Sequence, residues 1–169
     1  LVFADFYPEN SNNVYLKLSN FSRSAGDEVR SSLKQLKDKK EIKSIVLDLR
    51  GNPGGLLDVA VDICDKFLKK DLLIVSTRGK EISSEKKYFA LEEPLAGKEK
   101  LIVLINGNSA SASEIVAGAM QDHDRGVILG TQSFGKGLVQ TISPLSFNTS
   151  LKITTAKYYT PSGRCIQKI

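Results

Sequence analysis

The pattern of apolar and polar positions divides the chain into strands and helices that alternate. Short apolar or alternating runs predict strands at 14–18, 44–49, 72–77, 87–91, 101–105, 127–129, 138–142 and 151–156. Apolar residues at helical spacing predict three helices, which begin near Ser24, Leu57 and Ala112. The strands at 72–77 and 87–91 are expected to form a hairpin. Such alternation is typical of a layered α/β domain, and 169 residues suffice for one core, so we expect a single domain over residues 1–169.

Composition and charge exclude several classes of function. The net charge of +5 comes from scattered lysines, without the basic and aromatic interleaving expected of a nucleic-acid interface. No apolar run approaches the roughly 20 residues of a membrane span. Cys64 falls on the apolar face of the second helix and is expected to be a buried free thiol, while Cys165 lies about a hundred residues further on. Neither these cysteines nor the single His123 belongs to a cluster with metal-ligand spacing, so no metal site is expected.

Two turns that lead from a strand into a helix are candidate sites. The first is GNPGG at 51–55, and the second is NGNSASAS at 106–113. In layered α/β folds, chemistry collects beyond the carboxyl ends of strands, where helix N-termini present free N–H groups. The glycines of GNPGG can adopt conformations closed to other residues and leave N–H groups pointing outward. That turn is either an anion or oxyanion site or simply a tight turn, and the motif alone does not decide between them.

The second turn offers a candidate nucleophile among three serines. Ser111 and Glu114 fit the capping box S-x-x-E, which gives Ser111 a purely structural interpretation. A serine between a strand and a helix, with small neighbours, is also how a nucleophilic hydroxyl is displayed. Ser109 and Ser113 compete with Ser111 for this role, and spacing alone does not choose among them.

A serine nucleophile needs a base, for which His123 and Lys136 are candidates. A helix of about ten residues would separate Ser111 from His123 by roughly 15 Å, well beyond hydrogen-bond reach. A lysine serves as a base only when its amine is neutral, a form that burial favours. Lys136 lies in GTQSFGKG, which fits the P-loop template except at Gly137, where Ser or Thr is required. Because a strand rather than a helix is predicted after Lys136, a phosphate-binding loop is disfavoured, and we expect no nucleotide site.

Four blocks of sequence resemble the carboxyl-terminal processing (tail-specific) serine proteases. They are IVLDLRGNPGG, NGNSASASEIVAGAMQDH, GTQSFGKGLVQT and TTAKYYTPSGR, in the order and spacing of that family. The resemblance runs from about Asn13 to Arg164. It implies a crotonase-like (Clp protease-like) α/β core and a serine endopeptidase that processes polypeptides near their carboxyl termini through an acyl-enzyme. It implies no metal or organic cofactor.

The resemblance also implies roles for individual residues. Ser111 aligns with the family's nucleophile and Lys136 with its general base, so that the two form a Ser/Lys dyad. Gln140 aligns with a glutamine that orients the lysine amine in related enzymes. Asp122 stands where some members have a functionally important aspartate, although an aspartate at a helix end is usually solvated.

An oxyanion hole is implied where the two turns would meet. The family's pattern assigns it to the backbone N–H of Ala112 and to one N–H of the GNPGG turn, from Gly54 or Gly55. Donors placed in this way stabilise the charge that develops in the tetrahedral intermediate.

Family members carry a PDZ domain before this core, and residues 1–22 are too few to form one. The expected partners are therefore polypeptide substrates and a PDZ domain in the parent protein, with homo-oligomer formation left open. The family suggests a bacterial extracytoplasmic setting. The alternative is a catalytically silent module of the same fold that grips peptides, against which the intact Ser111, Lys136 and Gln140 argue.

Overall fold

The computed structural model describes residues 1–168, apart from the side chain of Ile82. Its strands are β1 (Val2–Phe6), β2 (Asn13–Leu18), β3 (Ser44–Asp48), β4 (Leu73–Gly79), β5 (Lys86–Phe89), β6 (Lys100–Ile105), β7 (Val127–Gly130), β8 (Leu138–Pro144) and β9 (Ser150–Tyr159). Its helices are α1 (Ala25–Lys39), α2 (Leu57–Asp65) and α3 (Ala112–Asp122), and a short 3-10 helix, η1 (Ile82–Ser84), lies between β4 and β5. The layered α/β fold predicted from the sequence is confirmed.

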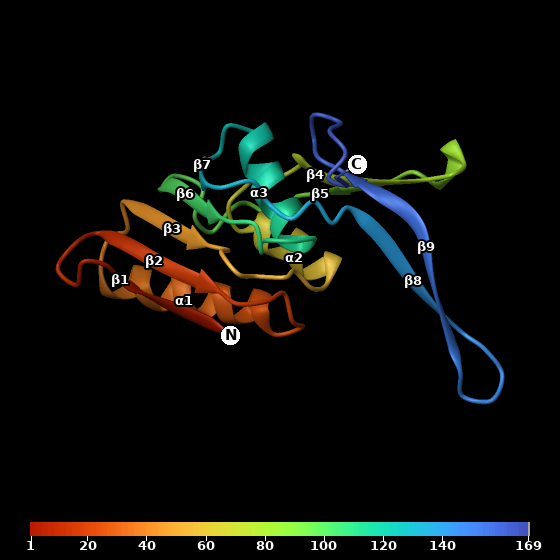
Figure 1. Cartoon of the computed structure of the whole chain (residues 1–169). Helices are drawn as coiled ribbons and strands as arrows, with labels where there is room; N and C mark the ends of the chain where they lie inside the picture. Colours follow the sequence, from red (N-terminus) through yellow and green to blue (C-terminus); the bar gives the residue numbers. More distant parts are fainter. Residues whose placement is uncertain (169) are drawn as a thin grey trace.

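A five-stranded sheet carries the two strand-to-helix turns. Its order is β1-β2-β3-β6-β7, with β1 antiparallel to β2 and the other neighbours parallel (Figure 1). Strands β3 and β6 are paired directly, with Leu47 opposite Val103. Because paired parallel strands end at the same edge of a sheet, the turns that follow β3 and β6 come together there.

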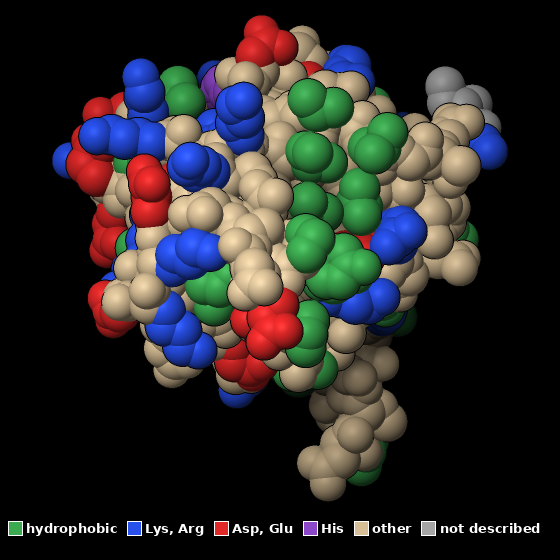
Figure 2. All heavy atoms as spheres, turned by 90° about the vertical axis from the view of Figure 1, so that its left-hand side faces the viewer, with side chains coloured by type: hydrophobic (Ala, Val, Ile, Leu, Met, Phe, Trp, Pro, Cys, Tyr) green, Lys and Arg blue, Asp and Glu red, His purple; other side chains and the backbone are tan. Residues whose placement is uncertain are grey.

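The core lies between this sheet and the helices. Alternate residues of β2, namely Val14, Leu16 and Leu18, are completely buried, as period-two alternation predicts. Helix α1 buries Val29, Leu33 and other residues of its predicted apolar face. Outward-facing positions such as Phe3, Val127 and Leu129 are exposed. Figure 2 shows hydrophobic side chains gathered in one band across the side of the molecule that lies on the left in Figure 1.

A second, antiparallel sheet has the order β5-β4-β9-β8. The hairpin expected near 72–77 and 87–91 is confirmed as β4 and β5. Strands β8 and β9 form a longer hairpin that extends away from the body of the molecule (Figure 1), and Phe147 at its tip is almost fully exposed. The segment that carries Lys136 leads directly into this hairpin, so a strand follows the lysine as predicted.

Two elements differ from the sequence prediction. Strand β1 was not predicted, because VFADF is short and carries an aspartate, and its pairing with β2 comes from the fold. Helix α2 ends at Asp65, although the helical spacing of apolar residues that starts at Leu57 continues in the sequence to Leu68. Phe67 and Leu68 are nevertheless buried, in the turn that follows the helix. Cys64 is buried and free as predicted, and burial raises the pKa of its thiol.

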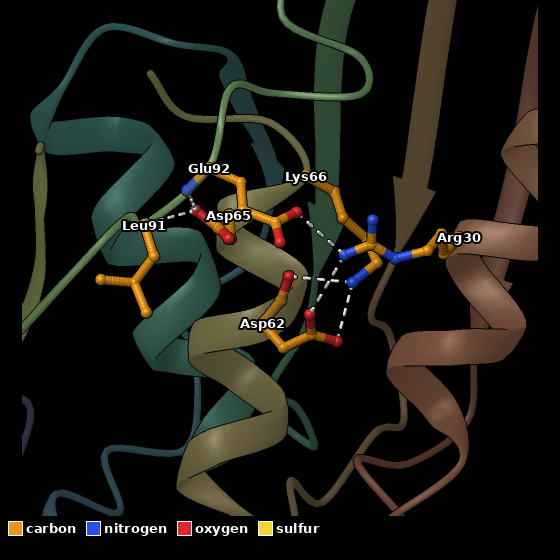
Figure 3. A network of polar contacts seen from close by, with 6 residues as sticks. All are labelled: Arg30, Asp62, Asp65, Lys66, Leu91 and Glu92. Atoms are coloured by element: carbon orange, nitrogen blue, oxygen red, sulfur yellow. Dashed lines mark hydrogen bonds and ion pairs between the residues drawn. The ribbon is translucent and has the colours of Figure 1, made fainter. Parts of the chain in front are cut away.

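A polar network joins α1 to α2 next to the core (Figure 3). The ammonium of Lys66, whose side chain is only 2% exposed, contacts the Asp62 carboxylate at 2.7 Å and donates to the Asp62 carbonyl at 3.0 Å. Arg30 reaches from α1 to Asp62 at 3.9 Å and to Glu92 at 3.4 Å. A Cβ on Gly26 would collide with the Asp62 carboxylate, so glycine allows α1 to approach α2 closely.

Candidate active site

Hydrogen bonds join the two strand-to-helix turns. The hydroxyl of Ser109 donates to the carbonyl of Leu49 at 2.8 Å, and the N–H of Ala110 donates to the carbonyl of Asn52 at 3.0 Å. The hydroxyl of Ser113 donates to the same Asn52 carbonyl at 3.0 Å. The turn after β6 is therefore fixed against the turn after β3 by both backbone and side chains.

These contacts distinguish the three serines of the second turn from one another. Ser109 and Ser113 are fully buried and their hydroxyls bind carbonyl groups of the other turn. Ser111 is half-buried, and no acceptor among residues 1–168 takes its hydroxyl hydrogen. Its backbone lies at φ 56° and ψ −113°, a conformation that costs a non-glycine residue roughly 1–3 kcal/mol and is concentrated at functional sites. Of the three serines, Ser111 is therefore the one whose hydroxyl is partly exposed and not engaged with the other turn.

The GNPGG turn lies directly against Ser111. A Cβ placed on Gly54 would lie 2.9 Å from the Cβ of Ser111 and 3.0 Å from the nitrogen of Ala112. The N–H of Gly54 is already used, because it donates to the side-chain oxygen of Asn52 at 2.9 Å. The N–H groups of Gly55 and Ala112 have no acceptor within the part of the chain that the structure describes. In these residues the N–H of Ala112, next to Ser111, is therefore free, and in the GNPGG turn the N–H of Gly55 is free whereas that of Gly54 is not.

A buried carboxylate supports the start of the GNPGG turn. Asp48 is completely buried and accepts hydrogen bonds from the Tyr15 hydroxyl at 2.6 Å and from the backbone N–H of Arg50 at 2.9 Å. The Arg50 guanidinium binds the same carboxylate at 2.7 and 2.9 Å. Burial alone would raise the pKa of Asp48, but the bonds from Arg50 and Tyr15 outweigh it and lower that pKa to about 2. The carboxylate is therefore charged near neutral pH and fixes the backbone at Arg50.

Glu114 in the first turn of α3 connects Ser111 with the loop of Lys136. Its carboxylate accepts the backbone N–H of Ser111 at 2.8 Å, of Lys136 at 2.8 Å and of Gly135 at 2.6 Å. The sequence identified Glu114 only as the partner of Ser111 in a capping box, which the structure contains. The bonds to Gly135 and Lys136 span more than 20 residues, and no local pattern signals them.

The backbone of Lys136 is thus close to Ser111, but its side chain is exposed. The structure gives no hydrogen bond or ion pair between the Lys136 amine and any residue from 1 to 168. Within residues 1–168 the side chain of Lys136 is therefore not enclosed by the apolar surroundings expected for a neutral amine, because the loop before β8 lies on the outside of the fold. Gln140 is also exposed, at a bulge in β8, and the structure does not bring it to Lys136.

Asp122 and His123 lie at the opposite end of α3 from Ser111. Asp122 accepts the backbone N–H of Ser162 at 2.9 Å and forms an ion pair with Arg164. Burial raises the pKa of Asp122, but its hydrogen bonds with Thr160, Ser162 and Arg164 outweigh this and lower it. The Nε2 atom of His123 lies 2.6 Å from the carbonyl oxygen of Leu73, which confirms His123 as a helix-end residue.

The C-terminal segment connects Asp122 with the loop of Lys136. Residues 160–164 form the turn that Asp122 binds, and the residues that follow this turn pack against the loop of Lys136. The N–H of Lys168 donates to the carbonyl of Gly135 at 2.9 Å, and the N–H of Gly137 donates to the side chain of Gln167 at 3.0 Å. The position of Asp122 therefore suits an indirect, supporting role and not contact with a substrate at Ser111.

Comparison with known families agrees with this geometry. The model of Peptidase family S41 matches residues 12–169. The chain belongs to this family. A carboxy-terminal-processing protease from Bartonella bacilliformis is 52% identical over 158 residues, which are 92% of this chain and 36% of that protein. A carboxyl-terminal-processing protease from Synechocystis is 41% identical over 157 residues, or 92% of this chain and 35% of that protein.

Solved structures lead to the same fold. The photosystem II D1 C-terminal processing protease superposes with a TM-score of 0.81 at 32% identity, covering 92% of this chain and 39% of that one. The chain thus spans about a third of the length of the curated relatives it matches. Among the helices that the structure describes, none combines the length and the apolar character needed to cross a bilayer. Residues 1–168 as described contain no group of three or more acidic, His or Cys side chains placed to hold a metal ion.

Proposed function

We propose that this chain is the catalytic core of a serine endopeptidase that cleaves polypeptides near their carboxyl ends through a Ser111/Lys136 dyad. The observation that carries the proposal is the surroundings of Ser111. Its hydroxyl is half-buried and bound to no acceptor in residues 1–168, on a strained turn that packs against the GNPGG turn. The N–H groups of Ala112 and Gly55 in these two turns have no acceptor in the same residues. The names of the relatives in Peptidase family S41 supply the substrate class.

In the proposed reaction, the Ser111 Oγ attacks the carbonyl carbon of the scissile peptide bond while its proton passes to the neutral amine of Lys136. The N–H groups of Gly55 and Ala112 donate to the oxyanion of the tetrahedral intermediate. Lys136 returns the proton to the leaving amine as the C–N bond breaks, which leaves an acyl-enzyme. A water molecule then gives a proton to Lys136 and attacks the ester carbonyl. The bond to Ser111 Oγ breaks, Ser111 takes the proton back from Lys136, and the new carboxyl terminus leaves. These steps use side chains and backbone of this chain and require no cofactor.

The exposed Lys136 sets a condition for this reaction. An amine in water is protonated near neutral pH, so Lys136 has to be covered before it can accept a proton. We propose that a bound substrate, or a further domain such as those expected in the parent protein, covers Lys136. The same cover would bring Gln140 to the amine. A PDZ domain in the parent protein, self-association and an extracytoplasmic location also belong to this proposal, on the basis of the family resemblance.

The test is covalent labelling with a fluorophosphonate, which phosphonylates an activated serine with loss of fluoride. We expect labelling at Ser111, identified by peptide mapping, and none in a Ser111→Ala variant. Ser113→Ala serves as the matched control, because the Ser113 hydroxyl binds Asn52 and should not react. Equal labelling of the wild type and Ser111→Ala would show that Ser111 is not the reactive serine.

One observation favours the alternative of a silent peptide-binding module, namely that residues 1–168 show no hydrogen bond between the Lys136 amine, which is exposed, and the Ser111 hydroxyl. A silent module would bind an unfolded polypeptide without cleaving it and would not react with the fluorophosphonate. Saturable binding of a peptide together with no labelling of Ser111 in the complete protein would decide for this alternative.

A further inference from the structure

The carboxylate of Glu114 is the only group in residues 1–168 that binds both the backbone of Ser111 and the backbone of Lys136. One of its oxygens, Oε2, accepts the N–H of Ser111 and the N–H of Lys136, each at 2.8 Å. The two nitrogens are therefore less than twice that distance apart. The other oxygen, Oε1, accepts the N–H of Gly135 at 2.6 Å.

The surroundings of Glu114 make these hydrogen bonds strong. The residue is only 6% exposed, and none of the ion pairs among the described residues involves it. Its charge is balanced by three N–H donors and by the N-terminus of α3, where a carboxylate is favoured. Hydrogen bonds to an ionised acceptor are roughly twice as strong as neutral ones, and a buried position keeps water from competing.

We infer that Glu114 is a positioning residue for the proposed dyad, which holds the segment of the base against the turn of the nucleophile. The inference rests on the proposed Ser/Lys function and deepens it. The loop that carries Gly135 and Lys136 is also held by the C-terminal segment, through the bond from Lys168 to the carbonyl of Gly135, and by the N–H of Phe134, which donates to the carbonyl of Ser109 at 3.0 Å. Among residues 1–168, only Glu114 binds the backbone of both Ser111 and Lys136, so it fixes these two residues relative to each other. A residue that contributes only a helix cap would need the bond to Ser111 and no bonds to Gly135 and Lys136.

Glutamine is the informative replacement because it keeps the size of the side chain. An amide has one acceptor oxygen, so its NH₂ group would face at least one of the three N–H donors. Either the Gly135 bond or the shared bond to Ser111 and Lys136 is then lost, and the loop shifts. A displacement of about 1 Å at a reacting centre can lower a rate by roughly 10²-fold.

The experiment is a double-mutant cycle on the rate of fluorophosphonate labelling of Ser111 in the complete protein. Glu114→Gln should lower the rate by about 10²-fold when Lys136 is present. In a Lys136→Ala background the same change should lower the residual rate by less than about threefold, because no base remains to be positioned. With a peptide substrate, kcat should fall while KM stays nearly constant. Glu28→Gln is the matched control, since Glu28 lies in the first turn of α1 and its polar partners are Ser24 and the N-terminal amine, which belong to neither turn of the site.

The outcomes distinguish this inference from the proposed function. Equal losses from Glu114→Gln in both backgrounds would contradict the inference and reduce Glu114 to a helix cap. A Lys136→Ala variant that labels at the wild-type rate would contradict the dyad and the inference together. If Glu114→Gln does not fold, amide hydrogen exchange of the wild type gives the answer. Slow exchange of Gly135 and Lys136 supports the inference, and exchange as fast as in the loop around Phe147 overturns it.

Discussion

The hydroxyl of Ser113 donates a hydrogen bond to the backbone carbonyl of Asn52 across 61 residues of sequence, at 3.0 Å. Both residues are completely buried, so water does not replace this bond when it is lost. The bond holds the turn after β6 against the GNPGG turn, which leaves the Ser113 hydroxyl engaged and the Ser111 hydroxyl available for the proposed reaction.

We therefore expect Ser113→Ala to cost about 1 kcal/mol of stability, the net value of a typical hydrogen bond, and to remain reactive at Ser111. Ser111→Ala should keep the wild-type stability within about 0.5 kcal/mol and lose its reactivity. Urea denaturation and fluorophosphonate labelling measure the two properties. A reactive Ser111→Ala beside an unreactive Ser113→Ala would reverse the assignment.

Asn52 should be the most sensitive residue of the GNPGG turn. Its side chain donates to the carbonyl of Leu18 at 2.9 Å and accepts the N–H of Gly54 at 2.9 Å. Asn52→Leu leaves both groups buried and unpaired, so we expect a loss of roughly 2–4 kcal/mol in the free energy of unfolding. Asn12→Leu is the control, because the Asn12 side chain donates to the carbonyl of Glu41 at the surface. This substitution should lower the free energy of unfolding by less than about 1 kcal/mol. Similar losses in both variants would contradict the account of the turn.

Substitution of Gly54 or Gly55 tests the proposed oxyanion donor. Both have positive φ, and a Cβ would come within 2.6 Å of the Ala110 carbonyl at Gly54 or 2.4 Å of the Phe21 carbonyl at Gly55. Valine at either position should displace the free N–H of Gly55, and loss of one such donor typically lowers the rate by about 10²–10³-fold. The measurement is turnover of a peptide by variants whose circular dichroism remains native. Folded variants with less than about a threefold loss would make GNPGG a structural turn only.

The sequence predicted those parts of the fold and site that depend on local patterns. The strand alternation of Val14, Leu16 and Leu18, the turn glycines and the third helix all follow from spacing or turn chemistry. The choice of Ser111 over its neighbours could not be made in this way, because it depends on which hydroxyls meet carbonyl groups of a distant turn.

Contacts between distant segments account for what the sequence did not predict. Glu114 meets Lys136 only because the loop before β8 passes the start of α3. The exposure of Lys136 likewise depends on what lies over the loop and not on its apolar neighbours. The roles of Lys136, Gln140 and Asp122 came from family resemblance and remain predictions.

Asp48 should make stability depend on pH in the acid range. Its pKa in the folded chain is about 2, below its ordinary value of 3.8, so ionised Asp48 stabilises the fold above about pH 4. This contribution, roughly 2 kcal/mol, should disappear as the pH falls from about 4 through 2. Denaturation at several pH values should show that loss in the wild type and not in Asp48→Asn. Parallel pH profiles for the two proteins would contradict the role of the Arg50 and Tyr15 contacts.

The network between α1 and α2 predicts unequal effects for two residues of one cluster. Asp62→Ala leaves the buried ammonium of Lys66 without its carboxylate, so we expect a loss of about 1–3 kcal/mol. Arg30→Ala removes two ion pairs, with Asp62 and Glu92, that are partly exposed to solvent. It should therefore lower the free energy of unfolding by less than about 1 kcal/mol. Thermal unfolding of both variants provides the comparison, and a larger loss for Arg30→Ala would be inconsistent with the burial of Lys66.

The central claim is that Lys136, and not His123, is the base for Ser111. Turnover of a common peptide by the complete protein and by its Lys136→Ala, Ser111→Ala and His123→Ala variants tests it most directly. We predict that Lys136→Ala is as inactive as Ser111→Ala, that the double variant is no worse, and that His123→Ala keeps most of its activity, since α3 separates His123 from Ser111. An active Lys136→Ala beside an inactive His123→Ala would contradict the dyad and require a histidine mechanism.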